Sequence, residues 1–123
     1  MKRKGFSYDE YSDSLLVSIR NENEIVKDNY EVGDIIFSLS EEGKILGVEI
    51  RAVSNFLESC EIDSAILKNV KNIELKVIPR REMLFLVLKF EVFDNSSIVY
   101  YDLPLIMPLI SLEENHRRSL ISA

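Results

Sequence analysis

Three carboxylates lie within five residues near the start of the chain, and their type and spacing suggest chemistry. Asp9, Glu10 and Asp13 could together present oxygen ligands to a divalent cation. Their pattern matches no calcium-binding loop, however, and an Asp in a turn ordinarily accepts hydrogen bonds from its own backbone. We therefore favour turn chemistry over a metal site for these acids, and the same holds for the turn at residues 41–43.

Glu49 lies between Val48 and Ile50 in a segment that we expect to be a strand. A buried carboxylate beside a suitable partner could act as a general base. Because side chains alternate along a strand, Glu49 falls on the face opposite the apolar residues, and a solvated outer face is the favoured interpretation.

The other residues that often do chemistry lack partners in the sequence. His116 is the sole histidine and lies in a polar segment beside two arginines, without the orienting neighbour that catalysis or metal binding needs. The four glycines are scattered and form no phosphate-binding loop. The sequence thus predicts no catalytic site and no bound cofactor.

The charge of the chain is unevenly distributed. The 123 residues have a formal net charge of −6. Residues 5–60 hold four Lys and Arg against twelve Asp and Glu, a net of −8, whereas residues 61–123 are close to neutral. A nucleic-acid binder needs a basic face, so we expect no direct contact with nucleic acid.

Cysteine content and hydropathy predict where the protein works. Cys60 is the only cysteine, which excludes an internal disulfide and a cysteine-based zinc site and suits the reducing cytoplasm. Residues 1–9 lack the apolar core of a signal peptide, and no apolar run approaches the ~20 residues that span a bilayer. We expect a cytoplasmic protein that does not contact membranes.

Alternating apolar residues and turn formers predict an α+β fold that is mostly β, an antiparallel meander of six to eight strands in hairpins. One or two short helices should lie between the two halves. Division at the helices gives a first part over residues 1–60 and a second over 61–123, packed as one compact unit. The strands are expected at residues 6–8, 15–19, 25–32, 35–39, 44–50, 72–78, 83–92 and 97–103. Helical spacing follows residue 51 and recurs at 63–70, where Asp63 or Ser64 would cap the helix.

The proline-containing strip over residues 103–110 is the second candidate for function. Pro104 and Pro108 lack a backbone N–H and so cannot lie in a central strand. The strip should therefore lie along an edge or cross a face. Either it is buried within the chain or it contacts another subunit or partner. The residues that would form such an interface are Leu103, Leu105, Ile106, Met107 and Leu109.

The first half also resembles a known family. Tyr8-Asp9, Asp13 before a Leu-rich strand, and the run from Glu42 to Ile50 followed by a short helix have the order and spacing of DUF2283. On these motifs residues 6–57 are similar to this family of small prokaryotic β-rich domains of unknown function. The resemblance implies a fold for the first half and no activity. Because genes of this family lie at times near small toxin-like genes, it also favours a small protein partner.

Three hypotheses of function remain. The favoured one is a noncatalytic binding or assembly module that forms a homo-oligomer. The alternative is an acidic, antitoxin-like partner that neutralises a small basic protein, since an acidic surface would speed that association. The third, a metal-dependent enzyme using the acidic turn, is the least favoured.

Overall fold

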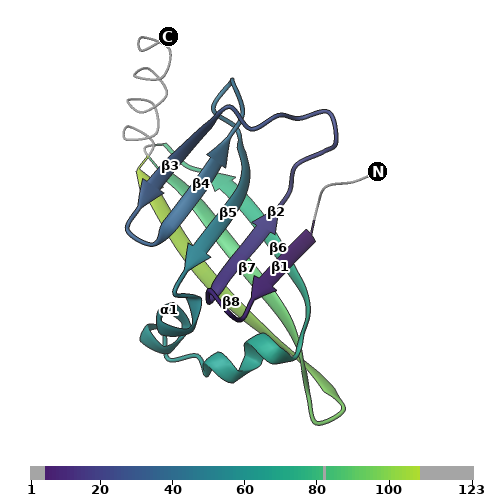
Figure 1. Cartoon of the computed structure of the whole chain (residues 1–123). Coiled ribbons are helices and arrows are strands. Elements are labelled where there is room, and N and C mark those ends of the chain that lie inside the picture. Colours follow the sequence, from purple (N-terminus) through teal and green to yellow (C-terminus); the bar gives the residue numbers. More distant parts are fainter. Residues whose placement is uncertain (1–4, 82, 109–123) are drawn as a thin grey trace.

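The protein consists of two β-sheets packed as two layers. In the chain, two short helical segments follow the last strand of the first sheet and precede the first strand of the second. The structure, a computed structural model, describes residues 5–81 and 83–108, with the backbone alone at residues 106–108. A five-stranded antiparallel sheet lies in front of a three-stranded one, and the strands of the two sheets cross (Figure 1).

The first sheet has the strand order β1-β2-β5-β4-β3. Its hairpins are β1–β2, β3–β4 and β4–β5, and the chain crosses over after β2 so that β5 returns to pair with β2. The five strands are β1 (Gly5–Asp9), β2 (Ser14–Ser18), β3 (Asp28–Val32), β4 (Ile35–Leu39) and β5 (Ile45–Arg51). This order places β5, the most deeply buried strand, at the centre of the sheet.

The second sheet is a simple meander in the order β6-β7-β8. Its strands are longer than those of the first sheet: β6 (Val70–Pro79), β7 (Met83–Asp94) and β8 (Ser97–Pro108). Residues 103–108 of the proline-containing strip form the second half of β8, which is an edge strand, where a missing backbone N–H is tolerated.

The core lies between the two sheets. Strict alternation directs Leu15, Val17 and Val48 of the first sheet toward Leu86, Leu88 and Phe90 of the second, and all six side chains are at most 1% exposed. Along one side of the molecule β1 and β2 lie next to β6, which closes the sandwich there.

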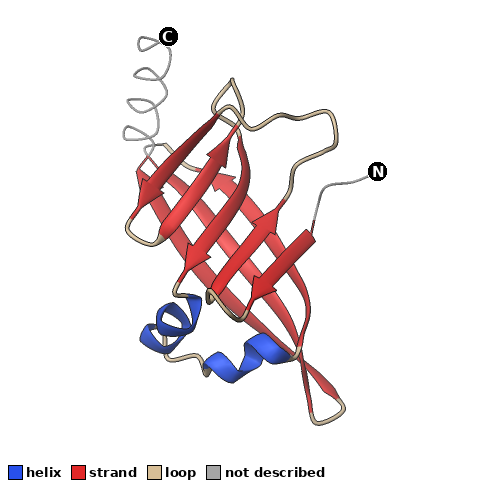
Figure 2. Cartoon of the chain, in the orientation of Figure 1, coloured by secondary structure: helices blue, strands red, loops and turns tan. Residues whose placement is uncertain are grey.

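Two short helical segments cover one end of the sandwich (Figure 2). The α-helix α1 (Val53–Ser59) inserts Val53 and Leu57 into the core, and the 3-10 helix η1 (Ser64–Lys68) adds Ile66 and Leu67. Asp63 caps η1, because its carboxylate accepts a hydrogen bond from the N–H of Ala65 at 2.9 Å. No helix among the described residues is long and apolar enough to cross a membrane.

Gly47 allows β5 to pack closely against β2. A Cβ atom at this position would lie 2.9 Å from the carbonyl oxygen of Val17, closer than real Cβ contacts come. The register between β4 and β5 also shifts beside Gly47, which leaves Leu46 as an extra residue. The close approach expected from a glycine inside this strand is therefore present.

The predicted fold class is confirmed. The described residues form eight antiparallel strands, and α1 and η1 come between the strands of the two sheets in the sequence. The division of the chain at residue 60 stays a prediction. The apolar run in β7 is typical of a strand covered on both faces, but Met83, Phe85 and Val87 on its outer face are only partly buried, because the fold has two layers and not three.

Candidate functional site

The acidic turn between β1 and β2 joins two residues with different tasks. The carboxylate of Asp9 accepts a hydrogen bond from the N–H of Tyr11 at 3.0 Å, which is local turn chemistry. Asp13 has a positive φ of 53°, a left-handed conformation that Asp adopts more readily than most residues. That conformation turns the chain into β2 and directs Asp13 toward α1.

Asp13 caps α1 from 41 residues away in the sequence. Its carbonyl oxygen accepts the N–H of Val53 at 3.0 Å, and its carboxylate accepts the N–H of Ser54 at 3.2 and 3.3 Å. The Ser54 hydroxyl also donates to Asp13 Oδ1, at 2.7 Å. The residue in the N-cap position, Ala52, has no side chain that could do this. Asp13 thus satisfies two N–H groups that the first turn of any helix leaves free.

Tyr8 completes this network from β1. Its hydroxyl donates to Asp13 Oδ1 at 2.9 Å. Burial alone would raise the pKa of the Asp13 carboxyl, but the hydrogen bonds from Ser54 and Tyr8 outweigh burial and lower that pKa below its usual value. Burial, followed by the hydrogen bond to Asp13, raises the pKa of Tyr8. The ionised carboxylate is therefore the form that the surrounding donors select.

The network borders an open groove of about 450 Å³. Asp63, Ser64 and Lys68 of the η1 region form the other wall, and Lys68 Nζ lies 3.7 Å from the Glu10 carboxylate across the groove. The groove is polar, and Tyr8, Asp13 and Ser54, which border it, hold β1, β2 and α1 together.

The arrangement of Ser54 and Asp13 does not suit nucleophilic catalysis. A hydroxyl nucleophile needs a base that accepts its proton, and a carboxylate whose pKa is lowered is a poor base. The two N–H groups at the start of α1, which could otherwise stabilise an oxyanion, already donate to Asp13. We conclude that the network is structural.

A metal site in the acidic turn finds no support in this geometry. Asp9 and Asp13 are engaged by different donors, Tyr11 for the former and Tyr8 and Ser54 for the latter. Across the part of the chain that the structure describes, no three His, Cys, Asp or Glu side chains gather in a way that could hold a metal ion.

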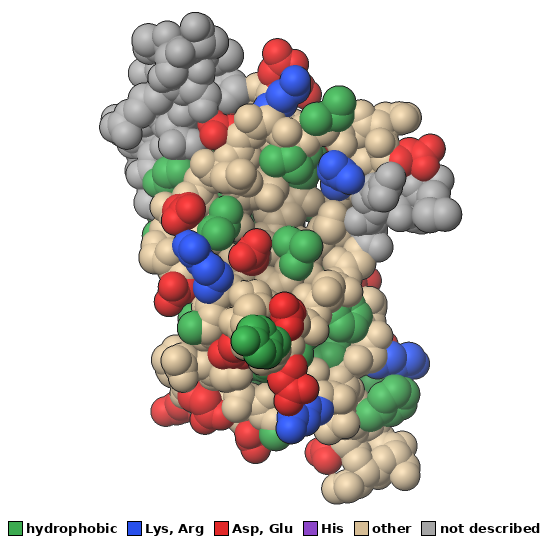
Figure 3. Space-filling view, viewed as in Figure 1, with side chains coloured by type: hydrophobic (Ala, Val, Ile, Leu, Met, Phe, Trp, Pro, Cys, Tyr) green, Lys and Arg blue, Asp and Glu red, His purple; other side chains and the backbone are tan. Residues whose placement is uncertain are grey.

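Glu49 lies on the outer face of the first sheet. In register it stands between Leu16 of β2 and Ile36 of β4, and its side chain is partly exposed. Figure 3 shows this face, on which hydrophobic side chains form separate spots with acidic and basic groups between them. Glu49 is thus remote from the Asp13 network, which lies at the end of the sheet.

The residues of the predicted interface have different fates. Leu103 and Leu105 are 1% and 6% exposed and pack in the core, so intrachain burial accounts for these two and they offer no surface to a partner. Ile106 and Met107 belong to β8, opposite Phe85 and Leu84. Leu109 lies outside the described residues, as does His116.

The sequence interpretation missed the link between Asp13 and Ser54. Asp in a turn was expected to serve its own backbone, whereas this carboxylate serves a helix that follows four strands later. A signal did exist: the helix expected after residue 51 begins at Ala52-Val53, and neither residue can cap it, so a cap had to come from elsewhere.

A comparison with protein families finds a match over this same region. Residues 6–54 match DUF2283, described as a protein of unknown function. The matched residues take in nearly all of β1, the whole of β2 to β5, and the first two residues of α1. They contain Tyr8, Asp13 and Ser54, and so include the complete capping network. Comparisons with curated proteins and with solved structures gave no match.

Replacing Asp13 tests whether the capping network is structural. Asp13→Asn keeps the size of the side chain but removes the charge that accepts hydrogen bonds from Ser54 and Tyr8. We expect the free energy of unfolding in urea at pH 7 to fall by about 2 kcal/mol, the range of charge-assisted hydrogen bonds and helix caps. Asp9→Asn is the matched control, and should change stability by less than about 0.5 kcal/mol. Equal effects of the two variants would contradict the assignment.

The stability that Asp13 contributes should depend on pH. Because folding lowers the pKa of this carboxyl, its contribution is present above the ordinary Asp value of about 3.9 and is lost as the pH falls through the folded-state value. The difference in unfolding free energy between the wild type and Asp13→Asn should therefore be full at about pH 6–7 and shrink at about pH 3. Urea titrations at each pH measure it, and a difference of the same size at both ends would show that the charge is unimportant.

Proposed function

We propose that this protein is a noncatalytic binding or assembly module of the cytoplasm, and that it forms a homo-oligomer. The observation that supports this proposal most is the outer face of the second sheet, the side turned away from the viewer in Figure 1. Phe93, Ile98 and Tyr100 on this face are 51%, 41% and 56% exposed. Large apolar side chains grouped on one face are typical of protein contacts.

The side chains that could take part in catalysis are held in structural contacts or lie apart from one another, which supports a noncatalytic role. Asp13 and Ser54 hold α1 to the first sheet, and Glu49 lies apart from them on an outer face. Cys60 is exposed as a free thiol, a state that suits a reducing compartment.

The oligomeric state is the direct test of this proposal. At about 10–100 μM, a range in which standard-sized interfaces associate, the full chain should sediment at twice the 14.2 kDa mass of one chain or more. Sedimentation velocity over a dilution series measures this. A single 14.2 kDa species at every concentration would rule out the assembly role.

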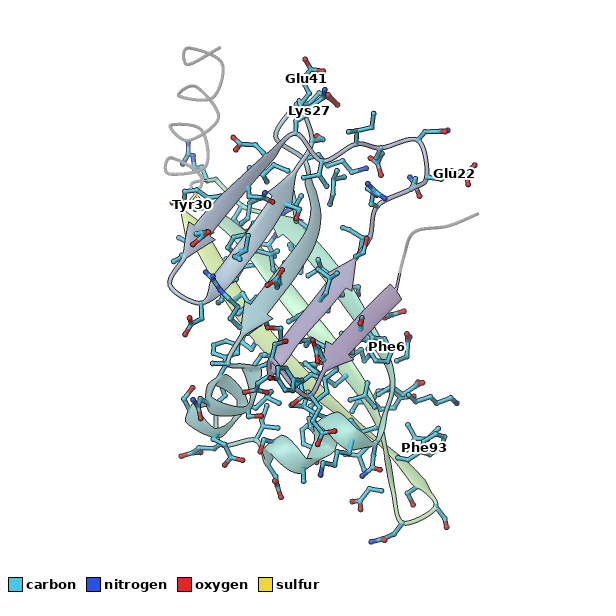
Figure 4. All side chains as sticks on the ribbon, viewed as in Figure 1. Phe6, Glu22, Lys27, Tyr30, Glu41 and Phe93 are labelled. Atoms are coloured by element: carbon cyan, nitrogen blue, oxygen red, sulfur yellow. The ribbon has the colours of Figure 1, made fainter. Side chains whose placement is uncertain are left out.

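A second candidate, an acidic partner of a small basic protein, is favoured by one feature of the first half. Glu24, Glu41 and Glu42 line a shallow groove of about 220 Å³ together with Ile25, which is 63% exposed. Figure 4 shows Glu22, Lys27 and Glu41 on the loops at this end of the molecule. An acidic groove beside an exposed aliphatic side chain suits an Arg or Lys with its long apolar stem.

Charge reversal in this groove distinguishes the second candidate. If a small basic protein encoded beside this chain is its partner, the two should co-purify, and Glu41→Lys should weaken their binding about tenfold, mainly through the association rate at low salt. Asp94→Lys, at the hairpin end of the second sheet, is the charge-matched control. Binding that responds equally to both substitutions, or to neither, would count against the acidic groove.

A further inference from the structure

The outer face of the second sheet combines apolar clusters with charges that already balance one another. At one end, Ile78 pairs in register with Phe85, and both are partly buried; at the other, Phe93 pairs with Ile98. Between them Lys89 stands in register with Glu74 on one side and Asp102 on the other. The face is therefore apolar at both ends and charge-balanced in the middle.

Each aromatic ring on this face also lies beside a cation. Lys71 lies 5.5 Å from the ring centre of Phe93, Arg80 lies 5.9 Å from that of Phe85, and Lys89 lies 5.2 Å from that of Tyr100. The hydroxyl of Tyr100 donates to Glu91 at 3.2 Å. Charges that lie beside an opposite charge or an aromatic ring cost less to desolvate when their face is covered than isolated charges do.

We propose that two copies of this chain pair through the outer faces of their second sheets. This inference rests on the proposed assembly function and names its surface. Charge selects the occupant: the described residues from 61 to 108 hold six Lys and Arg and six Asp and Glu, a net of zero, against −8 for residues 5–60. A basic partner would be attracted to the first half of the chain, whereas this neutral face suits a second copy.

The same charge distribution explains the orientation. Contact through the first sheets would bring together the acidic halves of the two copies, residues 5–60, whose charges sum to −8 in each chain. Contact through the second sheets keeps the acidic faces at opposite ends of a stack of four sheets, with about 10 Å between neighbouring layers. That separation of about 30 Å exceeds the Debye length of about 8 Å in physiological salt, so the acidic faces would hardly repel one another.

The size of the face also fits a dimer. Twelve-residue strands such as β7 and β8 are about 40 Å long, and three neighbouring strands together cover a width of about 14 Å. This footprint, enlarged by its side chains, is comparable to the roughly 800 Å² that each partner buries in a standard interface. Pairing through the free edge of β8 is less favourable, because Pro104 and Pro108 interrupt its row of backbone donors. Face-to-face packing covers the exposed aromatic side chains of this sheet, which pairing at the β8 edge would leave in solvent.

Acidic substitutions on the two outer faces test the pairing. Val87 lies near the middle of the second sheet with its side chain on the outer face, and Val87→Glu would place an additional carboxylate, next to Lys76 in register, inside the proposed contact. Leu16→Glu is the matched control, since Leu16 is 46% exposed on the outer face of the first sheet. Tyr100→Asp is a second variant on an exposed position, in case Val87→Glu disturbs folding. Circular dichroism melts check that all three fold.

In sedimentation velocity the wild type and Leu16→Glu should dimerise alike, whereas Val87→Glu and Tyr100→Asp should raise the dimer dissociation constant at least about tenfold. A dimer that persists unchanged in folded Val87→Glu and Tyr100→Asp would overturn this surface and leave the assembly function standing. A dimer lost only in Leu16→Glu would place the contact on the first sheet instead. A wild type that is monomeric throughout would overturn both the surface and the assembly function.

Discussion

The mutual burial of the two inner sheet faces is the constraint on which the rest of the structure depends. Each sheet has one apolar face, and an antiparallel sheet with such a face must cover it. Phe90, Leu86 and Leu88 are inaccessible to solvent only because Leu15, Val17 and Val48 lie opposite them. Each such side chain contributes about 2 kcal/mol on burial. The crossing of the sheets leaves one end open, and α1 and η1 close it with four further apolar residues.

That closing segment explains the role of the Asp13 carboxylate. A helix of seven residues is too short to be stable alone, so α1 depends on packing and on the satisfaction of its first N–H groups. Asp13 contributes to both. It accepts hydrogen bonds from the first N–H groups of α1, and its position in the β1–β2 turn holds the helix against the sheet that it covers. Tyr8 and Asp13, from the first hairpin, act as one unit with Ser54, which follows 41 positions after Asp13, and the match to DUF2283 spans all three.

The two outer faces differ in a way that separates possible partners. The outer face of the first sheet and its loops belong to the acidic half, in which Lys44 and Arg51 already pair with Glu24 and Glu31. The outer face of the second sheet is neutral and holds aromatic rings beside cations. An acidic surface attracts basic molecules over a distance, whereas a neutral, partly apolar surface gains affinity on contact. One small fold thus offers two surfaces of different character.

Much of the fold could be predicted from local sequence, and the tertiary links could not. Alternation placed Leu15 and Val17 inside and Leu16 outside, and Gly33 and Gly43 marked hairpin turns, because the strand period and the left-handed conformation are local properties. Whether Val87 is covered depends on the number of layers, and whether Leu103 meets the core or a partner depends on the path of β8; neither is encoded locally. The sequence by itself determined strands, turns and the uneven charge. Only the tertiary structure decided that Asp13 caps α1, since that contact joins residues 41 positions apart and needs β2 to pair with β5, which places Ser14 opposite Arg51 just before the helix.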